Sequence, residues 1–476
     1  METDVLVVGA GPTGLTLANE LLLAEVPAVL ADKLPRRSTL QKAGGVQSRT
    51  QEAFDQRGLL EPLLAGGNHP VGTAHFAGIT LPLTLDRHRH PWRSIPQVEI
   101  ERFLENHLAA RDVHVWRDHE LTGIAQDKGG VTATFANGRV VRSRYLVAAD
   151  GGRSTVRSLL GDEFPGRPGT VTLVAADVRL SGEQPKTHNR SEDGHWAAVF
   201  PLGADPQGRP LHRLSLGGPG RSLPRETPIT EDEIRDGLRA VFGDRVQLAE
   251  LCYARRITNA ARQAARYRHG RVFLAGDAAH VHLPIGAQGM NTGIQDALNL
   301  GWKLGAAVHE WAPEHLLDTY HAERHPVAAA VLRNVQAQSL MMDHEGTRDP
   351  DLMAARDLFA DLTRLRDVQF RLDDLLSGMG IRYPMPDAAG RPLVGLPAPD
   401  QDLGPVRSHE LLRRGRGVLI DPADRFAKVA ARWQNRVDRV GGGAEPMLIR
   451  PDGYVCWAGD PDTLESALGH WFGAPS

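Results

Sequence analysis

The segment DVLVVGAGPTGLTLANELLLAEVPAVLADK, residues 4–33, decides the fold. Val5 to Val8 form a continuous apolar run, which is typical of a strand buried on both faces. Leucines and alanines at helical spacing follow, and a second apolar run ends at Asp32. The segment therefore predicts a strand, a glycine turn, a helix and a second strand that ends in an acid.

The glycine turn has the spacing GxGxxG, made by Gly9, Gly11 and Gly14. Gly9 permits the tight turn, Gly11 lets a pyrophosphate approach the backbone, and Gly14 lets the helix pack closely on the strand. The start of the helix presents free N–H groups to phosphate, and Asp32 can accept hydrogen bonds from ribose hydroxyls. This context predicts dinucleotide binding, although the motif alone does not separate FAD from NAD.

Two later apolar runs also end in an acid beside a glycine. RYLVAADGGRSTVR, residues 144–157, contains Asp150, and RVFLAGDAAHVHLPIGAQGMN, residues 271–291, contains Asp277. A simple NAD dehydrogenase needs neither stretch, whereas a long ligand that lies across several strand ends uses both. A helix is expected to begin in IPQVEIERFLENHL, residues 95–108, which carries Gln97. Together these stretches favour FAD.

The chain resembles the class A FAD-dependent aromatic monooxygenases, the p-hydroxybenzoate hydroxylase-like family. Within that family it is similar to the actinomycete aromatic-polyketide hydroxylases and to rifampicin monooxygenase. The resemblance implies bound FAD, with NAD(P)H and O2 as co-substrates. The matching segments span nearly the whole chain in the family's order, and they are GAGPTGL, QSRTQEAFDQRGLLE, IPQVEIERFL, DGGRSTVR, LAGDAAHVHLPIGAQGMNTGIQDALNLGWKL, LLDTYHAERHPVA and IRPDGYVCW.

The same resemblance implies which residues contact FAD. Asp32 and Lys33 lie at the adenosine ribose, Leu121 and Thr155 lie near the adenine half, and Gln97 faces the flavin side chain. Asp150 belongs to a motif linked to both FAD and NAD(P)H, Asp277 holds the ribityl–pyrophosphate region, and residues 284–291 wrap the isoalloxazine ring. The full implied set is Gly9, Gly11, Pro12, Thr13, Gly14, Asp32, Lys33, Lys42, Gln97, Leu121, Asp150, Thr155, Asp277, Pro284, Gly286, Gly289, Met290 and Asn291.

His280 and His282 alternate, as two histidines that share a metal ion would. A metal site needs at least a third ligand, and Asp277 is the only nearby candidate, which the resemblance assigns to FAD. Gly286 and Gly289 explain the stretch better, because they let the main chain approach a flat ring. We therefore expect no metal here and predict that the histidines pack or support the cofactor site.

A helix should follow these glycines, because Met290, Ile294 and Leu298 recur at helical spacing. We expect Thr292 and Gln295 to help cap its start. The helix would then direct N–H groups and its positive dipole end at the N1/C2 carbonyl edge of the flavin. That edge becomes negative on reduction, so this field favours the reduced anion.

One position departs from the family pattern. Lys42 stands where relatives often carry an arginine near the flavin. Lysine keeps the charge but loses the planar fork of donors. Our hypothesis is that Lys42 still tracks the mobile flavin edge. No residue is predicted as a certain catalyst, and Lys42 and Arg213 are the candidates.

We predict an α/β protein with a discontinuous Rossmann-like FAD-binding domain at residues 1–71, 97–175 and 263–385. An inserted, sheet-rich substrate-binding domain should take residues 72–96 and 176–262. A Pro/Gly-rich linker, 386–405, should lead to a C-terminal thioredoxin-like domain, 406–476. That domain has no CxxC motif, so we expect no redox role for it. Candidate substrate residues, each of which sheet packing explains equally well, are Trp92, His195, Trp196, Phe200, Arg213 and Pro284.

Composition limits the partners. The chain has 476 residues, 41% of them hydrophobic and 24% charged, with a formal net charge of −3. That balance argues against nucleic acid and anionic membrane surfaces, and it fits a small-molecule substrate. The two cysteines, Cys252 and Cys456, lie far apart, and no signal peptide or membrane span is recognised. We expect a reducing, cytoplasmic setting, and a homodimer is a further expectation.

By resemblance, NAD(P)H reduces FAD and oxygen adds at flavin C4a to give a hydroperoxide. That species transfers one oxygen atom to an electron-rich, polycyclic, polyketide-type aromatic ring, as in antibiotic biosynthesis. The alternative within flavin chemistry is Baeyer–Villiger oxygenation of a related ketone. A halogenase is a less favoured alternative, because the segment PWRSIP lacks the second tryptophan of the WxWxIP halogenase motif. A non-catalytic flavin protein or a plain dehydrogenase would show no oxygen-dependent, substrate-stimulated NAD(P)H oxidation.

Overall fold

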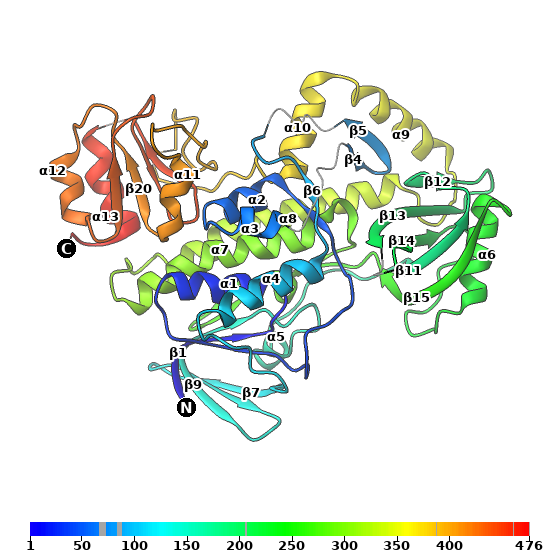
Figure 1. Cartoon of the computed structure of the whole chain (residues 1–476), viewed down its shortest axis with the longest axis horizontal. Helices are drawn as coiled ribbons and strands as arrows, with labels where there is room; N and C mark the ends of the chain where they lie inside the picture. The colour runs from blue at the N-terminus through cyan, green and yellow to red at the C-terminus, as the bar shows by residue number, and fades with distance from the viewer. Residues whose placement is uncertain (66–72, 83–87, 205–206, 387, 460, 476) are drawn as a thin grey trace.

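The computed structural model describes residues 1–65, 73–82, 88–204, 207–386, 388–459 and 461–475 (Figure 1). Its first sheet has seven strands, which are β1 (Glu2–Val8), β2 (Ala28–Ala31), β7 (Leu121–Gln126), β8 (Val131–Phe135), β9 (Val140–Ala148), β17 (Arg268–His269) and β18 (Val272–Leu274). The order β17-β18-β9-β1-β2 places β1 parallel to both β2 and β9, and β18 parallel to β9. The predicted strand, turn, helix and strand of residues 4–33 are confirmed.

The parallel strands bring the three predicted motifs to one edge of this sheet. Val8 lies opposite Ala148, which also lies opposite Leu274, so β1, β9 and β18 end side by side. The turns at Gly9 and Asp150 therefore lie next to the turn that contains Asp277. The carboxyl edge of a parallel sheet is where such folds bind long cofactors.

Helices cover the sheet and extend beyond it (Figure 1). α1 (Pro12–Leu23) packs on α4 (Gln97–Ala109) and on α7 (Gln288–Val308), and α7 packs on α8 (Asp318–Met341). The helix predicted from the spacing of Met290, Ile294 and Leu298 is confirmed by α7. Shorter helices are α2 (Ser48–Asp55), α3 (Leu60–Leu64) and α5 (Thr155–Leu159), and single turns occur at η1 (Gly276–Ala278) and η2 (Ile285–Ala287).

A second sheet of five strands has the order β12-β13-β14-β11-β15. α6 (Glu231–Phe242) packs on its outer face, away from α7 and α8 in Figure 1, over Val174, Val199 and Leu216. Its other face contacts Leu283 and Ile285, which precede α7. The strands are β11 (Thr172–Gly182), β12 (His188–Arg190), β13 (Trp196–Ala204), β14 (Pro210–Gly217) and β15 (Val246–Thr258).

Smaller elements connect these parts. The hairpin of β4 (Thr73–Phe76) and β5 (Ile79–Pro82) packs through Phe76 and Leu81 on Leu372 and Leu376. These leucines belong to α10 (Arg366–Ser377), which follows α9 (Pro350–Leu362). Short strand pairs involve β3 (Gly45–Val46), β6 (Arg93–Ser94), β10 (Gly166–Arg167), β16 (Ala261–Gln263) and β19 (His280–Val281).

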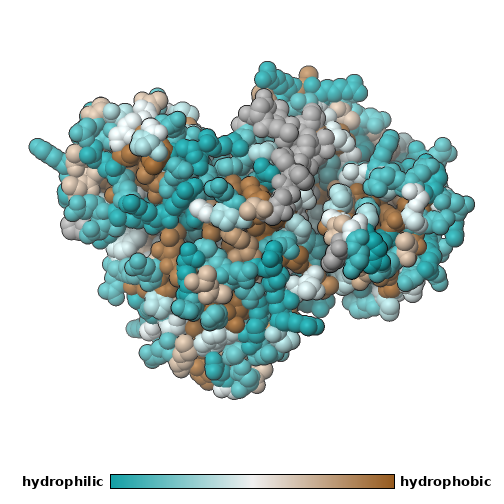
Figure 2. All heavy atoms as spheres, in the orientation of Figure 1, coloured by the Kyte–Doolittle hydropathy of each residue, from teal (hydrophilic) through white to brown (hydrophobic). Residues whose placement is uncertain are grey.

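The C-terminal segment forms a four-stranded sheet in the order β21-β20-β22-β23. Its core continues into Trp302 and Ala306 of α7, so this segment packs against the helix that begins at the predicted flavin loop. Hydrophilic residues cover most of the face seen in Figure 2, and no helix in the described ranges could cross a membrane. The elements are α11 (Ser408–Leu411), η3 (Leu412–Arg414), β20 (Gly417–Ile420), α12 (Ala427–Ala430), η4 (Ala431–Trp433), β21 (Val437–Val440), β22 (Met447–Ile449), β23 (Val455–Ala458), η5 (Pro461–Thr463) and α13 (Leu464–Phe472).

Candidate FAD site

The first glycine loop is tight everywhere except at its middle glycine. A Cβ atom added at Gly9, whose φ is +105°, would lie 2.3 Å from the carbonyl oxygen of Ala149. A Cβ atom at Gly14 would lie 1.9 Å from the carbonyl oxygen of Gly9. At Gly11 it would meet no atom within 4 Å. The open space over Gly11 at the start of α1 is the cradle that a pyrophosphate requires.

Asp32 closes this loop from the end of β2. Its Oδ2 atom accepts a hydrogen bond of 2.7 Å from the N–H of Ala10, and its Oδ1 atom accepts one of 2.8 Å from the N–H of Leu34. Each carboxylate oxygen has a further lone pair, so ribose hydroxyls can still donate to Asp32. Lys33 is exposed beside it.

Asp150 presents one unused oxygen atom. Its Oδ2 atom accepts hydrogen bonds from the N–H groups of Thr155 (2.8 Å) and Val156 (3.2 Å). Its Oδ1 atom is buried and has no partner among the described residues. Burial raises the pKa of this carboxyl group. A hydroxyl or N–H of a bound ligand would satisfy Oδ1, which is the behaviour expected of a cofactor contact.

The loop at Asp277 is held against the first glycine loop. Thr13 lies between Gly276 and Gly293, since a Cβ atom on either glycine would come within 2.5 Å of its Oγ1 atom. The starts of α1 and α7 therefore converge. Asp277 itself is exposed in η1, and none of the described residues bonds to its carboxylate, which leaves it accessible to a ligand. Leu121 is different, because its side chain is buried in the core and leaves only its main chain for a ligand.

The predicted flavin loop has an unusual backbone. Gly286 (φ +66°) and Ala287 (φ +52°) are both left-handed, and α7 begins directly after them. The expected capping by Thr292 and Gln295 is wrong, because the helix starts at Gln288 and both residues lie beyond its first turn. The Oγ1 atom of Thr292 donates instead to the carbonyl of Gln288, at 2.9 Å.

Asn291 fixes the start of α7 to β3. Its amide Nδ2 donates to the carbonyls of Gly45 (2.8 Å) and Ala287 (2.7 Å), and its Oδ1 atom accepts from the N–H of Gln47 at 3.0 Å. The buried side chain is thus used by the protein, so only the surrounding backbone is free to contact a ring. Pro284 is exposed and Gly289 and Met290 are half-buried along this loop.

His280 has a partner that the sequence interpretation missed. Its Nε2 atom lies 2.8 Å from Oδ2 of Asp296, which also accepts a 3.0 Å hydrogen bond from the N–H of Gly276. Arg324 donates from Nε to Oδ1 of Asp296 at 2.7 Å, and all three side chains are buried. Asp277 is therefore not the only acid near the histidines. No local pattern in the sequence indicates this contact, because Asp296 lies 16 residues after His280.

The two catalytic candidates lie near each other through Gln41. Arg213 donates to the carboxylate of Asp177 and to the carbonyl of Gln41, which precedes the exposed Lys42.

Gln97 donates to Oε1 of Glu101 at 2.7 Å. Burial raises the pKa of Glu101, and the charge of Lys42 acts against that effect.

The substrate candidates divide between two faces of the second sheet. Trp196 is buried toward α8, and its Nε1 atom donates to the carbonyl of His344 at 3.0 Å. Phe200 points to the same face, beside the rings of His75 and His188. The side chain of His195 lies apart from them and lines a hollow beside α6. Neighbouring residues in an extended chain point to opposite faces.

Trp92 lies elsewhere, against β3. A Cβ atom added at Gly45 would lie 3.1 Å from its Nε1 atom, which is buried without a partner among the described residues. Because β3 is bonded to the start of α7 through Asn291, Trp92 lies near the predicted flavin loop.

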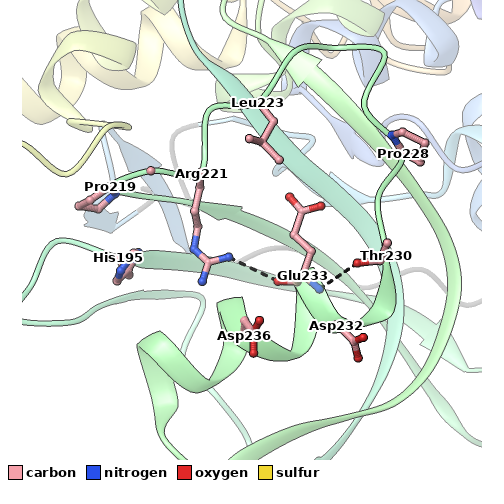
Figure 3. Close-up of a pocket in the computed structure, with 10 residues that line it drawn as sticks. His195, Pro219, Arg221, Leu223, Pro228, Thr230, Asp232, Glu233 and Asp236 are labelled. Carbon is pink, nitrogen blue, oxygen red and sulfur yellow. Dashed lines mark hydrogen bonds between the residues drawn. The ribbon is translucent and has the colours of Figure 1, made fainter.

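His195 lines a hollow of about 570 Å³ beside α6 (Figure 3). Arg221 donates to the carbonyl of Glu233, and Thr230 caps the helix by accepting from the N–H of Glu233. Asp232 and Asp236 add negative charge to this open surface. The hollow contains no residue of the glycine loops, and its acids disfavour a phosphate ligand, so it is not the cofactor site.

One group among the described residues has metal-ligand spacing, namely Asp55, Asp400 and His409. Arg407 donates to the carboxylates of both aspartates, and Arg413 donates to Asp55. The cationic position between these acids is thus already taken by guanidinium groups.

Comparison with known proteins agrees with this geometry. A family model described as "FAD binding domain" matches residues 2–335, and one described as "Aromatic-ring hydroxylase, C-terminal" matches residues 391–475. The chain is 41% identical to rifampicin monooxygenase of Streptomyces venezuelae over 99% of both chains. This chain belongs to the class A FAD-dependent aromatic monooxygenases.

The monooxygenase has further full-length relatives. It is 39% identical to the 12-dehydrotetracycline 5-monooxygenase/anhydrotetracycline 6-monooxygenase of Streptomyces rimosus over 100% of both chains. The solved structure of an anhydrotetracycline hydroxylase from Streptomyces rimosus superposes with a TM-score of 0.89, at 38% identity and over 100% of both chains. The cofactor of this monooxygenase is FAD, and the open space over Gly11 and the unused Oδ1 atom of Asp150 fit it.

Proposed function

We propose that the enzyme uses NAD(P)H and O2 to insert one oxygen atom into a polycyclic, polyketide-type aromatic substrate. The reaction consumes NAD(P)H, a proton, O2 and the arene, and it yields NAD(P)+, water and the phenol. Bound FAD would supply the electron transfer and the activated oxygen, as a C4a-hydroperoxide. The observation that carries the proposal is the convergence of the loops at Gly11 and Asp277 with the left-handed loop before α7.

Each part of this site has a task in the proposal. The loop at Gly11 and the carboxylate of Asp32 would hold the pyrophosphate and the adenosine ribose, while Asp150 would accept a hydrogen bond through Oδ1. The start of α7 would direct its positive dipole end at the flavin ring and stabilise the reduced anion. Asn291 would keep that helix end in place by its bonds to Gly45 and Ala287.

Lys42 would follow the flavin edge in this proposal. The carbonyl of its neighbour Gln41 accepts a hydrogen bond from Arg213 of the second sheet. A movement of the chain at Lys42 would therefore also move a residue proposed to contact the substrate. Replacing Lys42 by alanine should slow flavin reduction or increase the share of NAD(P)H spent on hydrogen peroxide. Unchanged values of both would remove Lys42 from the mechanism.

The domain division is also part of the proposal. The five-stranded sheet of β11 to β15 supports an inserted substrate-binding domain, and the four-stranded sheet of β20 to β23 supports a thioredoxin-like fold. Assembly as a homodimer and residence in the cytoplasm stay predictions.

The test is NAD(P)H consumption by the FAD-loaded protein with a panel of polycyclic phenols and quinones, under air and under nitrogen. We expect one class of compound to accelerate oxidation only in air and to gain one oxygen atom, labelled when ¹⁸O2 is used. A phenolic product supports hydroxylation, whereas a lactone or ester product supports Baeyer–Villiger oxygenation instead. A rate of NAD(P)H oxidation that no compound changes, or a protein that binds no FAD, would contradict the proposal.

A further inference from the structure

Arg255 is a half-buried cation without a partner. It lies on β15, and no hydrogen bond or ion pair joins its guanidinium to any residue in the described ranges. The next residue, Arg256, is bonded to both carboxylate oxygens of Glu233 at 2.9 and 2.7 Å. Burial lowers the pKa of Arg255, as expected for a desolvated charge. A half-buried guanidinium without a counter-ion can bind an anionic group of a ligand.

The strand register places Arg255 on the face of the sheet that is turned toward the FAD-binding part. Arg256 contacts α6 on the outer face, so Arg255 points the other way. Ile257, which shares the face of Arg255, packs in the cluster that contains Ile285 of the predicted flavin loop and the preceding Leu283. Since alternate residues of a strand are about 7 Å apart, Arg255 lies within reach of that loop.

The neighbours of Arg255 explain why it lacks a counter-ion. Directly across the ladder lies Ala175, where an acid would normally pair with an arginine. The next position along the same row is Ser215, which is neutral. Asp177, the acid whose charge acts on Arg255, is already bonded to Arg213.

The charges that act on Arg255 are predominantly positive. The charges of Arg213 and Arg225 oppose its ionisation, while the carboxylate of Asp177 and the phenol group of Tyr253 favour it. Because Arg213 already engages Asp177, this part of the sheet has surplus positive charge. Phe200, opposite Arg213 on the same face, adds an aromatic surface.

We propose that Arg255 binds an ionised oxygen of the aromatic substrate, in the form of a phenolate, an enolate or a carboxylate. This inference rests on the proposed function and adds to it a specificity-determining residue and a substrate class. A guanidinium can hold such an oxygen through a charge-assisted hydrogen bond, and it would lower the pKa of a phenol bound beside it. An ionised oxygen donates electron density to the ring, which favours attack by an electrophilic oxygen atom.

The test compares two probes that differ in charge, anthraquinone-2-carboxylate and anthraquinone-2-carboxamide. Each is titrated into the FAD-loaded protein while the flavin absorbance is followed, so no turnover is needed. The wild-type protein should prefer the carboxylate. Arg255→Met should bind the carboxylate about 10- to 100-fold more weakly and bind the carboxamide unchanged, and Arg255→Lys should recover part of the loss.

Arg266→Met is the matched control, because Arg266 is exposed on the chain between β16 and β17, outside the proposed site. It should leave both affinities unchanged, and an intact flavin spectrum confirms that each variant is folded. A wild-type protein without preference for the carboxylate, or an Arg255→Met variant that loses both probes equally, would overturn the proposal.

A second arm separates the substrate from the nicotinamide cofactor, whose phosphates are also anionic. If Arg255→Met raises the KM for NADPH and leaves the carboxylate affinity unchanged, Arg255 binds the cofactor and the proposal is overturned. If the charge preference is intact but no compound gains an oxygen atom, the anion site stands and the proposed oxygenation fails.

Discussion

Nε2 of His280 lies 2.8 Å from Oδ2 of Asp296, and both side chains are fully buried. Asp296 accepts from the N–H of Gly276 through the same oxygen atom, and its other oxygen atom faces Arg324. The loop before Asp277 is therefore bonded to the middle of α7. His280, which resembles a metal ligand in the sequence, instead connects the loop at Asp277 to α7 within the candidate FAD site.

Replacing Asp296 by asparagine should weaken FAD binding and destabilise the fold. The substitution leaves the buried Arg324 without its counter-charge, and such losses cost about 3–5 kcal/mol. FAD affinity is measured by fluorescence titration and stability by urea unfolding. Asp318→Asn, which affects an exposed ion pair with Arg268, should change neither value appreciably. An Asp296→Asn protein with normal FAD affinity would show that the contact between His280 and Asp296 does not position the cofactor loop.

The two glycines of the first loop should respond differently to substitution. Gly11→Leu should fold, because space is open at that position, but it should lose FAD, because its side chain enters the cradle. Gly14→Ala should fail to fold normally, because its Cβ atom would lie 1.9 Å from the carbonyl oxygen of Gly9. Flavin absorbance and circular dichroism distinguish the two cases. The control is Gly441→Leu, at an exposed glycine with open space, and it should keep both signals.

Stability should fall between neutral and mildly acidic pH because of His344. Burial lowers the pKa of this histidine to about 4, and neither ring nitrogen has a partner among the described residues. The unfolded chain takes up the proton near pH 6.5, so the folded state loses about 2 kcal/mol between pH 7 and pH 5 from this group.

His344→Phe should reduce that loss by about the same 2 kcal/mol, since phenylalanine keeps a ring beside Trp196 and does not titrate. Urea unfolding of wild type and variant at both pH values checks the prediction. His114→Phe, at an exposed histidine, is the control. Equal pH dependence in wild type and His344→Phe would be the contrary result.

A buried ionic network should be needed to hold the C-terminal segment. Arg450 donates to both oxygens of Glu323 on α8, at 2.6 and 2.9 Å, and Lys303 on α7 donates to the same carboxylate at 2.8 Å. Arg450→Met should cost about 3 kcal/mol or more in thermal unfolding, because the carboxylate stays buried with less compensation.

Combining Arg450→Met with Glu323→Met should cost less than the sum of the two single changes, because the double change removes both charges. Arg235→Met, at an exposed pair on α6, should cost at most about 1 kcal/mol. Additive costs for Arg450→Met and Glu323→Met would mean that the two residues are not coupled.

Thiol labelling should distinguish the two cysteines. Cys252 is exposed, whereas Cys456 is buried and burial raises the pKa of its thiol. A thiol reagent should therefore modify Cys252 in the native protein and both cysteines after denaturation. Cys252→Ser should leave the native protein unreactive. Rapid native labelling of Cys456 would revive a redox role for the C-terminal segment.

Much of the nucleotide-binding half could be predicted from the sequence alone. The apolar run of Val5 to Val8, the spacing of Gly9, Gly11 and Gly14, and the acid at Asp32 are local patterns with local causes. Strand burial, tight turns and helix starts depend on residues that are close in the chain. The structure confirms these elements, and the comparisons confirm the family to which they point.

Other features were decided only by tertiary structure. Asp296 reaches His280 because α7 packs on η1, which follows β18. Arg255 lacks a partner among the described residues because Ala175 lies opposite it on the neighbouring strand. His195 and Trp196 are adjacent in the chain, yet they point to opposite faces of the sheet. Pairing between distant segments, strand register and burial arise from packing of the whole chain, and the spacing of residues along one segment does not specify them.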